Sequence, residues 1–296
     1  MDVLVTGGTG FLGRHLCAEL HGRGHGVTAL SRTPAPDHVP DGVATVTGDL
    51  TDPDSVAGHV EGKDALVNLV ALSPLFQPRG GETRHDVVHR GGTETCIALA
   101  ESHDVDRFLQ MSALGADPDG PTHYLRAKGR AETHVRESTL SWTIVRPSVV
   151  FGDGAEFLSF TRRLTPPILA PLPGGGHTPF QPIHVADLVP ILAAALESEA
   201  HVGQTYEIGG PEVLELADVA RLLARARGRS VRVLPVPMAL AGLALTLGDY
   251  LPGFPMGPDQ YRSLRLDNTP DENDIAAFDV SPAALTTLSA YLGVGE

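Results

Sequence analysis

The sequence has very little cysteine. Only two cysteines occur among 296 residues, Cys17 and Cys96, and neither has a second thiol or a histidine at metal-ligand spacing. We expect both to be small buried side chains, because this pattern favours neither a disulfide nor a zinc site. The thirteen histidines include no His-Glu-x-x-His or comparable cluster, so we expect no metal site.

Lysine is almost absent as well. Lys63 and Lys128 are the only two lysines, and the formal net charge is −14. Such an acidic chain disfavours nucleic acid and anionic membrane surfaces as electrostatic partners. Lysine depletion also suggests adaptation to high salt, although a G+C-rich genome would give the same bias toward arginine. A halophilic protein would lose stability on transfer from molar salt into dilute buffer.

No apolar run is long enough to span a membrane. The longest runs, such as residues 238–247, are well short of the roughly 20 residues that a spanning helix needs. The first expected strand starts at residue 2, which leaves no room for a signal peptide, so we expect a cytoplasmic location. For the apolar segment 237–247 we expect core packing, with a hydrophobic pocket, a partner or a membrane as alternatives.

Strand-like and helix-like segments alternate through the first half of the chain. This order predicts an α/β fold with a Rossmann-like, doubly wound parallel sheet and a smaller C-terminal α/β lobe. Proline and glycine between residues 165 and 176 exclude a central strand or a long helix there. We expect strands near residues 3–6, 26–30, 44–47, 65–70, 107–112, 142–145 and 204–208, and helices near 11–23, 54–60, 83–102, 122–138, 187–197 and 216–226. We expect a nucleotide-binding domain from 1–150 with a returning segment 184–209, and a second lobe from 151–183 and 210–296.

A glycine-rich loop connects the first strand to the first helix. Gly8-x-Gly10-x-x-Gly13 is a weak pattern alone, but here it follows a strand and opens a helix. Glycines at 7 and 10 permit a tight turn and close approach of a pyrophosphate, and Gly13 lets the helix pack on the strand. An ordinary glycine-rich turn is the alternative. The expected cofactor contacts here are Gly7, Thr9, Gly10, Phe11, Leu12 and Gly13.

The end of the second strand favours NADP(H) over NAD(H). An acidic residue there would bind the ribose 2′-hydroxyl of NAD, whereas this chain has Ser31 and Arg32. A guanidinium suits the additional phosphate of NADP, and Arg14 offers a second positive charge. The alternative is that both arginines are ordinary surface residues.

The next two strand ends supply further cofactor-binding candidates. Asp49 can accept a hydrogen bond from the adenine amine, with a simple turn aspartate as the alternative, and Leu50 follows it. The fourth strand ends at Val70 and Ala71, whose small side chains leave room for the ribose and pyrophosphate.

Tyr124 and Lys128 are four residues apart on an expected helix. Residues at this spacing share a helix face, so the phenol and the ammonium can reach one bound molecule. We expect the cation to lower the tyrosine pKa and to make the phenol a general acid or base. A solvated helix face is the alternative.

Together these features resemble the extended short-chain dehydrogenase/reductase superfamily over nearly the whole chain. The runs MSALGA at 111–116, YLRAK at 124–128, PFQPIHVAD at 179–187 and YEIGGP at 206–211 are most similar to its atypical branch, which contains the nucleotide-binding accessory subunit of respiratory complex I. The resemblance implies that Tyr124 donates or accepts the proton and that Lys128 binds the nicotinamide ribose. It also implies cofactor contacts at Met111, Pro147 and Val149.

One position departs from the catalytic members of that superfamily. A serine or threonine that polarises the substrate oxygen is usual there, and Leu114 stands at the aligned position. Ser112 is the nearest hydroxyl and a candidate catalytic residue that faces the cofactor or the strand end, while Thr122 or Ser148 could substitute for the missing group. We expect structural roles for His184 and Asp187.

Two functional hypotheses follow. The first is an NADP(H)-dependent oxidoreductase or epimerase-like enzyme that uses Tyr124 and Lys128 on a small-molecule, lipid-like or quinone-like substrate. The second is a non-catalytic NADP(H)-binding assembly factor or peripheral subunit of a respiratory NADH dehydrogenase complex, at the inner face of the membrane. A homodimer is the oligomeric state that extended relatives suggest.

Overall fold

The structure is a computed structural model that describes residues 1–166, 168–240 and 258–295. The chain forms two compact units. The first contains Met1–Leu72, Glu82–Arg146 and Val185–Tyr206, and the second contains Ser73–Gly81, Pro147–His184 and Glu207–Glu296. Besides small shifts at the boundaries, this division differs from the expected one by assigning residues 73–81 to the second unit.

A seven-stranded sheet forms the centre of the first unit, in the order β11-β6-β5-β4-β1-β2-β3. Every neighbouring pair from β6 to β3 is parallel. The strand order reverses between β1 and β4, which is where doubly wound sheets bind nucleotides. The strands are β1 (Asp2–Thr6), β2 (Gly26–Ser31), β3 (Ala44–Thr47), β4 (Ala65–Asn68), β5 (Arg107–Met111), β6 (Ser141–Pro147) and β11 (Gln204–Ile208).

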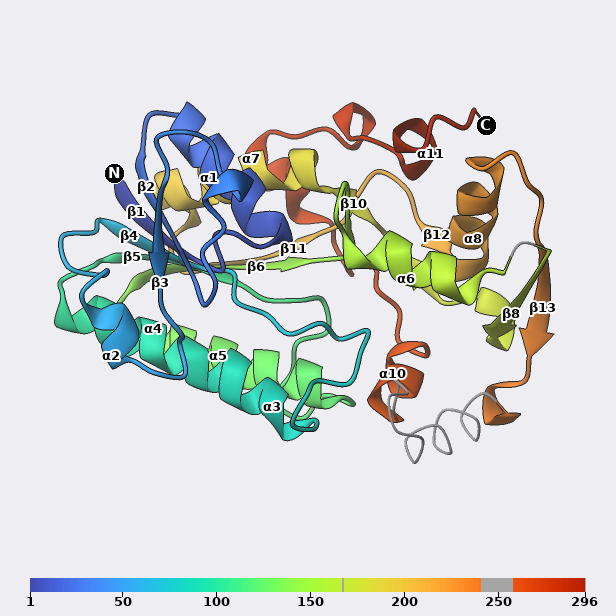
Figure 1. Cartoon of the computed structure of the whole chain (residues 1–296), viewed down its shortest axis with the longest axis horizontal. Coiled ribbons are helices and arrows are strands. Elements are labelled where there is room, and N and C mark those ends of the chain that lie inside the picture. The colour runs from blue at the N-terminus through green and yellow to red at the C-terminus, as the bar shows by residue number, and fades with distance from the viewer. Residues whose placement is uncertain (167, 241–257, 296) are drawn as a thin grey trace. The chain divides into compact units, whose positions relative to one another are not determined.

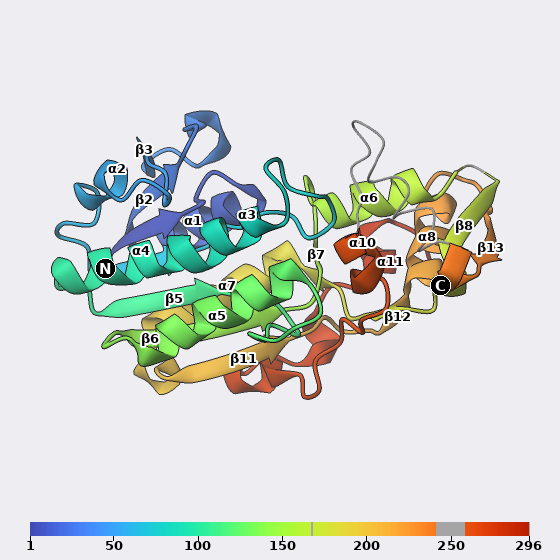
Figure 2. The same cartoon turned by 90° about the horizontal axis from the view of Figure 1, so that it is seen from below.

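Helices cover both faces of this sheet (Figure 1). On one face α1 (Phe11–Gly22) packs against α7 (Val185–Glu197), and on the other α4 (Gly92–Ser102) packs against α5 (His123–Glu137). Figure 2 shows α4 and α5 running side by side along their face. The sequence-based helices and strands of this unit are therefore confirmed to within a few residues. Two short helices, α2 (Asp54–Ala57) and α3 (Thr83–His85), and the 3₁₀ turns Pro36–His38 and Glu199–His201 complete the unit.

The helix expected over residues 83–102 contains a wide turn. A π-helical stretch, Asp86–Gly91, separates α3 from α4. Such turns are rare and occur mostly at functional sites.

The core of the first unit is apolar, and a buried polar cluster lies at the carboxyl ends of three strands. Leu4, Leu66 and Phe108 have no exposed surface. The Asn68 side chain accepts a hydrogen bond from the Thr6 hydroxyl at 2.9 Å and donates to the side-chain oxygen Oε1 of Gln110 at 3.0 Å and the Thr93 hydroxyl at 3.1 Å. These bonds connect the carboxyl ends of β1, β4 and β5 to α4.

Both cysteines are buried, as expected. Cys17 is fully buried and Cys96 is 1% exposed. Burial raises the pKa of each thiol to about 12. Thiols this weakly acidic are inert packing groups.

The second unit is built from short strand pairs and helices. Its strands pair as β7 with β10, β9 with β12 and β8 with β13. The proline-rich stretch thus contributes β8 to a two-stranded sheet, in agreement with the exclusion of a central strand. The bounds are β7 (Val150–Phe151), α6 (Glu156–Leu164), β8 (Leu169–Pro173), β9 (Pro179–Phe180), β10 (Ile183–His184), β12 (Leu214–Glu215), α8 (Leu216–Arg225), β13 (Arg232–Val236), α10 (Pro258–Ser263) and α11 (Leu288–Tyr291), with 3₁₀ turns at Gly174–Gly176, Asp274–Phe278 and Pro282–Ala284.

The apolar segment 237–247 is only partly within the described residues, because 241–257 lie outside them. Among the residues that the structure describes, no helix is both long and apolar enough to cross a membrane.

Candidate functional site

The loop between β1 and α1 is a tight backbone turn. Gly7 has φ = +73°, a conformation that residues with a β-carbon rarely adopt. Its amide donates to the Leu30 carbonyl at 2.8 Å, and the Gly10 amide donates to the Gly7 carbonyl at 3.0 Å. The turn is therefore fixed to β2 and to itself before any ligand is bound.

Two other glycines make room for this turn. A β-carbon at Gly13 would lie 2.2 Å from the Gly7 carbonyl oxygen, and one at Gly8 would lie 2.7 Å from the Ala29 β-carbon. Gly13 thus lets α1 pack closely on Gly7 and Gly8 of the turn, whereas the expected packing on the strand stays a prediction. At Gly10 the nearest atom to an added β-carbon is again the Gly7 oxygen, at 3.1 Å.

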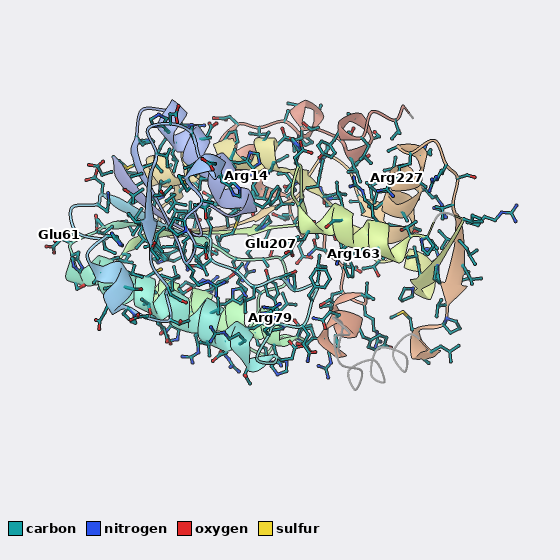
Figure 3. All side chains as sticks on the ribbon, viewed as in Figure 1. Arg14, Glu61, Arg79, Arg163, Glu207 and Arg227 are labelled. Atoms are coloured by element: carbon teal, nitrogen blue, oxygen red, sulfur yellow. The ribbon has the colours of Figure 1, made fainter. Side chains whose placement is uncertain are left out.

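The first turn of α1 fits the phosphates of a dinucleotide. It contains no acidic side chain. The amides of Phe11, Leu12 and Gly13 occupy the first turn, where amides have no partner within the helix and the helix dipole is positive. Arg14 follows on the same helix (Figure 3), and the residues of this loop therefore suit a pyrophosphate.

Beyond β2, basic residues lie near Asp49. Arg32 is exposed, while the Ser31 hydroxyl donates to the Thr33 carbonyl at 3.0 Å. Burial raises the pKa of Asp49, but hydrogen bonds from Thr51 and the charges of Arg32 and Arg84 outweigh it, so that the pKa is lowered. Sequence reasoning did not identify Arg84, which comes from α3.

The remaining expected cofactor contacts differ in their surroundings. Leu50 is 4% exposed and its side chain is part of the hydrophobic core, against which Val70 also packs, whereas Ala71 is exposed. Pro147 ends β6, and Val149 packs against a core cluster of the second unit.

Tyr124 and Lys128 lie in the first half of α5. The helix starts after Thr122, whose hydroxyl oxygen accepts a hydrogen bond from the Leu125 amide at 3.2 Å. Lys128 is 2% exposed, and its ammonium donates to the Met111 carbonyl at the end of β5, at 2.8 Å. Burial lowers the pKa of Lys128 to about 8, although the negative charge of Glu132 acts to raise it.

The expected lowering of the Tyr124 pKa is wrong. Burial raises the pKa of the phenol instead. The physical reason is that burial disfavours the charged phenolate, while the nearby ammonium is directed at the Met111 carbonyl. Tyr124 is therefore protonated at neutral pH, as a general acid must be.

Two histidines pack against the Tyr124 ring. The His85 and His89 rings are stacked 5.5 Å apart with an interplanar angle of 10°. Both meet Tyr124 edge to face, with ring centroids 5.7 Å and 5.2 Å away. His89 is 2% exposed, and its Nε2 accepts a hydrogen bond from the Leu72 amide at 3.4 Å.

Ser112 is engaged by a buried carboxylate. Its hydroxyl donates to Glu132 at 2.5 Å, and Glu132 also accepts hydrogen bonds from Arg146 at 2.7 and 2.8 Å and from Arg136 at 2.7 Å. A catalytic role of Ser112 stays a prediction. Its observed contact fastens the end of β5 to α5, two turns beyond Tyr124, and the Arg146 contact does the same for β6.

The two suggested substitutes for a catalytic hydroxyl also have other partners. Thr122 caps α5, and the Ser148 hydroxyl donates to Asn268 within the second unit. Leu114 is 5% exposed. The two hydroxyls suggested as substitutes for the group missing at Leu114 thus already have hydrogen-bond partners.

A family model described as NAD(P)H-binding matches residues 7–163, which include the glycine turn, Tyr124 and Lys128. The chain belongs to this family. Residues 7–163 accordingly form its NAD(P)H-binding region, and the resemblance to extended short-chain dehydrogenases/reductases is confirmed.

Two curated relatives of this family member have different functions. The chain is 32% identical over 256 residues to the mitochondrial NADH dehydrogenase (ubiquinone) 1 alpha subcomplex subunit 9 of Arabidopsis thaliana. The aligned region covers 80% of this chain and 61% of the relative. It is 28% identical to the NAD(P)H azoreductase of Xenophilus azovorans, with 82% of this chain and 80% of that one covered.

Solved structures of epimerases share the fold. A nucleoside-diphosphate-sugar epimerase from Staphylococcus aureus matches with a TM-score of 0.75 over 99% of both chains, at 18% identity. The Rossmann-like α/β architecture predicted for this family member is therefore confirmed.

The structure also places the two residues expected to be structural. His184 ends β10, where its ring packs 5.1 Å from Phe151 and 5.2 Å from Tyr291. Asp187 lies in the first turn of α7.

Sequence reasoning missed His85, His89 and Glu132. A signal was present, because His85 and His89 are four residues apart and Glu132 continues the four-residue spacing of Tyr124 and Lys128. This spacing predicts that the residues share a helix face, but it does not predict which neighbouring helix packs against that face.

Proposed function

We propose that this family member is an NADP(H)-dependent oxidoreductase that uses Tyr124 as its proton donor and Lys128 as its partner. The observation that carries the proposal is the face of α5 on which a protonated, partly buried phenol lies one turn from an ammonium bonded to the end of β5. The glycine turn of the same unit suits a dinucleotide phosphate.

When bound, NADPH would supply the hydride for reduction of a substrate carbonyl and would become NADP⁺. Tyr124 gives its proton to the carbonyl oxygen, so that hydride and proton together convert the carbonyl to an alcohol. Lys128 holds its ammonium beside the site and stabilises the phenolate left behind. The phenolate then regains a proton from solvent.

The preference for NADP(H) is part of the proposal. Arg32 supplies an exposed guanidinium beyond β2, and Arg84 and Arg14 add positive charge from α3 and α1. The additional phosphate would take charge-assisted hydrogen bonds from such groups.

The substrate proposed is a small, lipid-like or quinone-like carbonyl compound. The azoreductase relative supports an NAD(P)H-dependent reduction. Epimerase-like chemistry is the variant that the shared fold of sugar epimerases suggests.

The decisive experiment compares NADPH oxidation by the wild type and by Tyr124→Phe over a panel of carbonyl substrates. We expect turnover to fall at least about 100-fold with the Kd for NADPH unchanged. Tyr206→Phe is the matched control, because that hydroxyl contacts His201 instead. Equal turnover in wild type and Tyr124→Phe would refute the catalytic assignment.

A second candidate function is a non-catalytic, NADP(H)-binding assembly factor or peripheral subunit of a respiratory complex. It is favoured by the similarity to a complex I subunit and by Leu114 at the usual hydroxyl position. In this case no substrate would oxidise bound NADPH, yet removal of the cofactor would unfold the protein. Cosedimentation with inner-membrane vesicles tests the peripheral association, and analytical ultracentrifugation tests a homodimer.

A further inference from the structure

We propose that His89 is a substrate-binding residue that supplies, as a neutral hydrogen-bond donor, the group that Leu114 cannot provide. This inference rests on the proposed function, because it concerns the oxygen that Tyr124 protonates. The ligand class is a molecule with a neutral acceptor oxygen, above all a carbonyl.

The hydrogen bond from Leu72 to His89 indicates the tautomer of the imidazole. Its Nε2 accepts from the Leu72 amide and therefore carries no proton in the neutral ring. The proton is then on Nδ1, which makes His89 a donor at that atom.

That donor has no acceptor among the residues that the structure describes. Nδ1 of His89 is buried and makes no hydrogen bond there. Buried polar groups nearly always have partners, because an unsatisfied one costs free energy. A ligand oxygen would satisfy Nδ1.

The position of His89 puts that donor beside the proton source. Its ring centroid is 5.2 Å from that of the Tyr124 ring, and Tyr124 itself is partly exposed. His89 also lies within the π-helical turn, the kind of irregularity that occurs mostly at functional sites. In this proposal one carbonyl oxygen of the ligand accepts hydrogen bonds from both His89 and Tyr124.

The surroundings keep the imidazole neutral. Burial lowers the pKa of His89 well below its usual value, and the charges of Lys128 and His85 lower it further. His85 in turn lies 3.6 Å from the Glu82 carboxylate. A neutral imidazole polarises a carbonyl without competing with Tyr124 for the role of acid.

Three variants test the role. His89→Phe keeps a flat ring against Tyr124 but removes Nδ1–H, and we expect kcat/KM for carbonyl reduction to fall about 100-fold with the Kd for NADPH unchanged. His89→Asn retains an acceptor and a donor, so we expect it to recover much of the loss. His103→Phe is the matched control, since His103 follows α4 and contacts the Leu99 carbonyl.

Binding can be observed without turnover. The protein saturated with NADP⁺ is labelled with ¹⁵N-histidine and ¹³C-tyrosine and titrated with 4-nitrobenzaldehyde, and His89→Phe and Tyr124→Phe assign the signals. We expect the His89 Nδ1 and Tyr124 resonances to shift together. A shift of Tyr124 alone would overturn the His89 proposal and leave the proposed function intact.

The kinetic outcomes separate the two proposals. Full activity in His89→Phe with loss of activity in Tyr124→Phe would overturn the role of His89 only. Full activity in Tyr124→Phe would overturn the proposed function. If neither resonance shifts in the titration, both proposals are contradicted. Thermal melts of each variant identify a folding defect. If His89→Phe does not fold, the titration of His89→Asn is compared with that of the wild type to assign the His89 signal and test its shift.

Discussion

The glycine turn and the Tyr124 site, both in the first unit, are built by opposite means. The turn of residues 7–13 depends on side chains that are missing: a β-carbon at Gly13 would lie 2.2 Å from a backbone oxygen. The Tyr124 site depends on side chains that are present and buried, Lys128 and His89 at 2% exposure and Glu132 at 1%. A backbone cradle needs space and amides, whereas proton transfer needs groups with adjusted pKa values.

The largest effect should come from the carboxylate that fastens α5. Glu132→Ala leaves the Arg146 guanidinium without its buried partner, so we expect a loss of about 4 kcal/mol in the free energy of unfolding. Chemical denaturation measures it. Glu94→Ala, which removes an exposed carboxylate paired with Arg90, should cost about 0.5 kcal/mol. Similar losses in both variants would show that Glu132 is an ordinary surface charge.

The glycine turn should break on the addition of one carbon. Gly13→Ala forces α1 away from the turn, and we expect a loss of about 3 kcal/mol together with a weakened Kd for NADPH. Gly22→Ala is the control, because a β-carbon at Gly22 meets no atom within 4 Å. If Gly13→Ala binds NADPH as tightly as the control, close packing is not what shapes the turn.

A pH titration tests the burial of Lys128. Burial lowers its pKa from 10.5 to about 8, so between these values the unfolded chain binds more protons than the folded protein. Stability contributed by this group must therefore rise as the pH increases through 8. From about pH 8 to about pH 9.5 we expect wild type to gain roughly 1.5 kcal/mol relative to Lys128→Met. Parallel stability curves for the two proteins would contradict a buried ammonium.

The smallest effect concerns cofactor choice. Arg32→Ala removes an exposed guanidinium, and we expect the Kd for NADPH to rise about tenfold while that for NADH is unchanged. Fluorescence titration of both cofactors measures the ratio. Arg126→Ala, on α5, is a control that should alter neither Kd. An equal change for NADPH and NADH would remove Arg32 from the phosphate site.

Much of the first unit was predictable because local signals agreed. Hydrophobic periodicity and glycine placement predict the succession of β1, turn and α1. They also predict the helices on both faces and the strands at residues 44–47 and 204–208. The π-helical turn at Asp86–Gly91 was not, since nothing in that short stretch distinguishes it from an ordinary helix.

Side-chain environments were less predictable. The Tyr124–Lys128 spacing was visible, but the direction of the Tyr124 pKa was wrong because burial, which depends on neighbouring elements, exceeds the effect of the nearby cation. Ser112 was identified as a hydroxyl at the end of β5, yet its partner Glu132 comes from α5, twenty residues later in the chain.

The sequence by itself determined the backbone features of this protein: the parallel alternation of strands and helices, the glycine turn and the shared face of Tyr124 and Lys128. These are local, because turn geometry and helix spacing involve residues close together in the chain. Only the tertiary structure decided that His85 and His89 pack on Tyr124, that Lys128 bonds to the end of β5, and that Glu132 fastens Ser112. Burial and pKa depend on what distant segments bring together, and no local pattern contains that information.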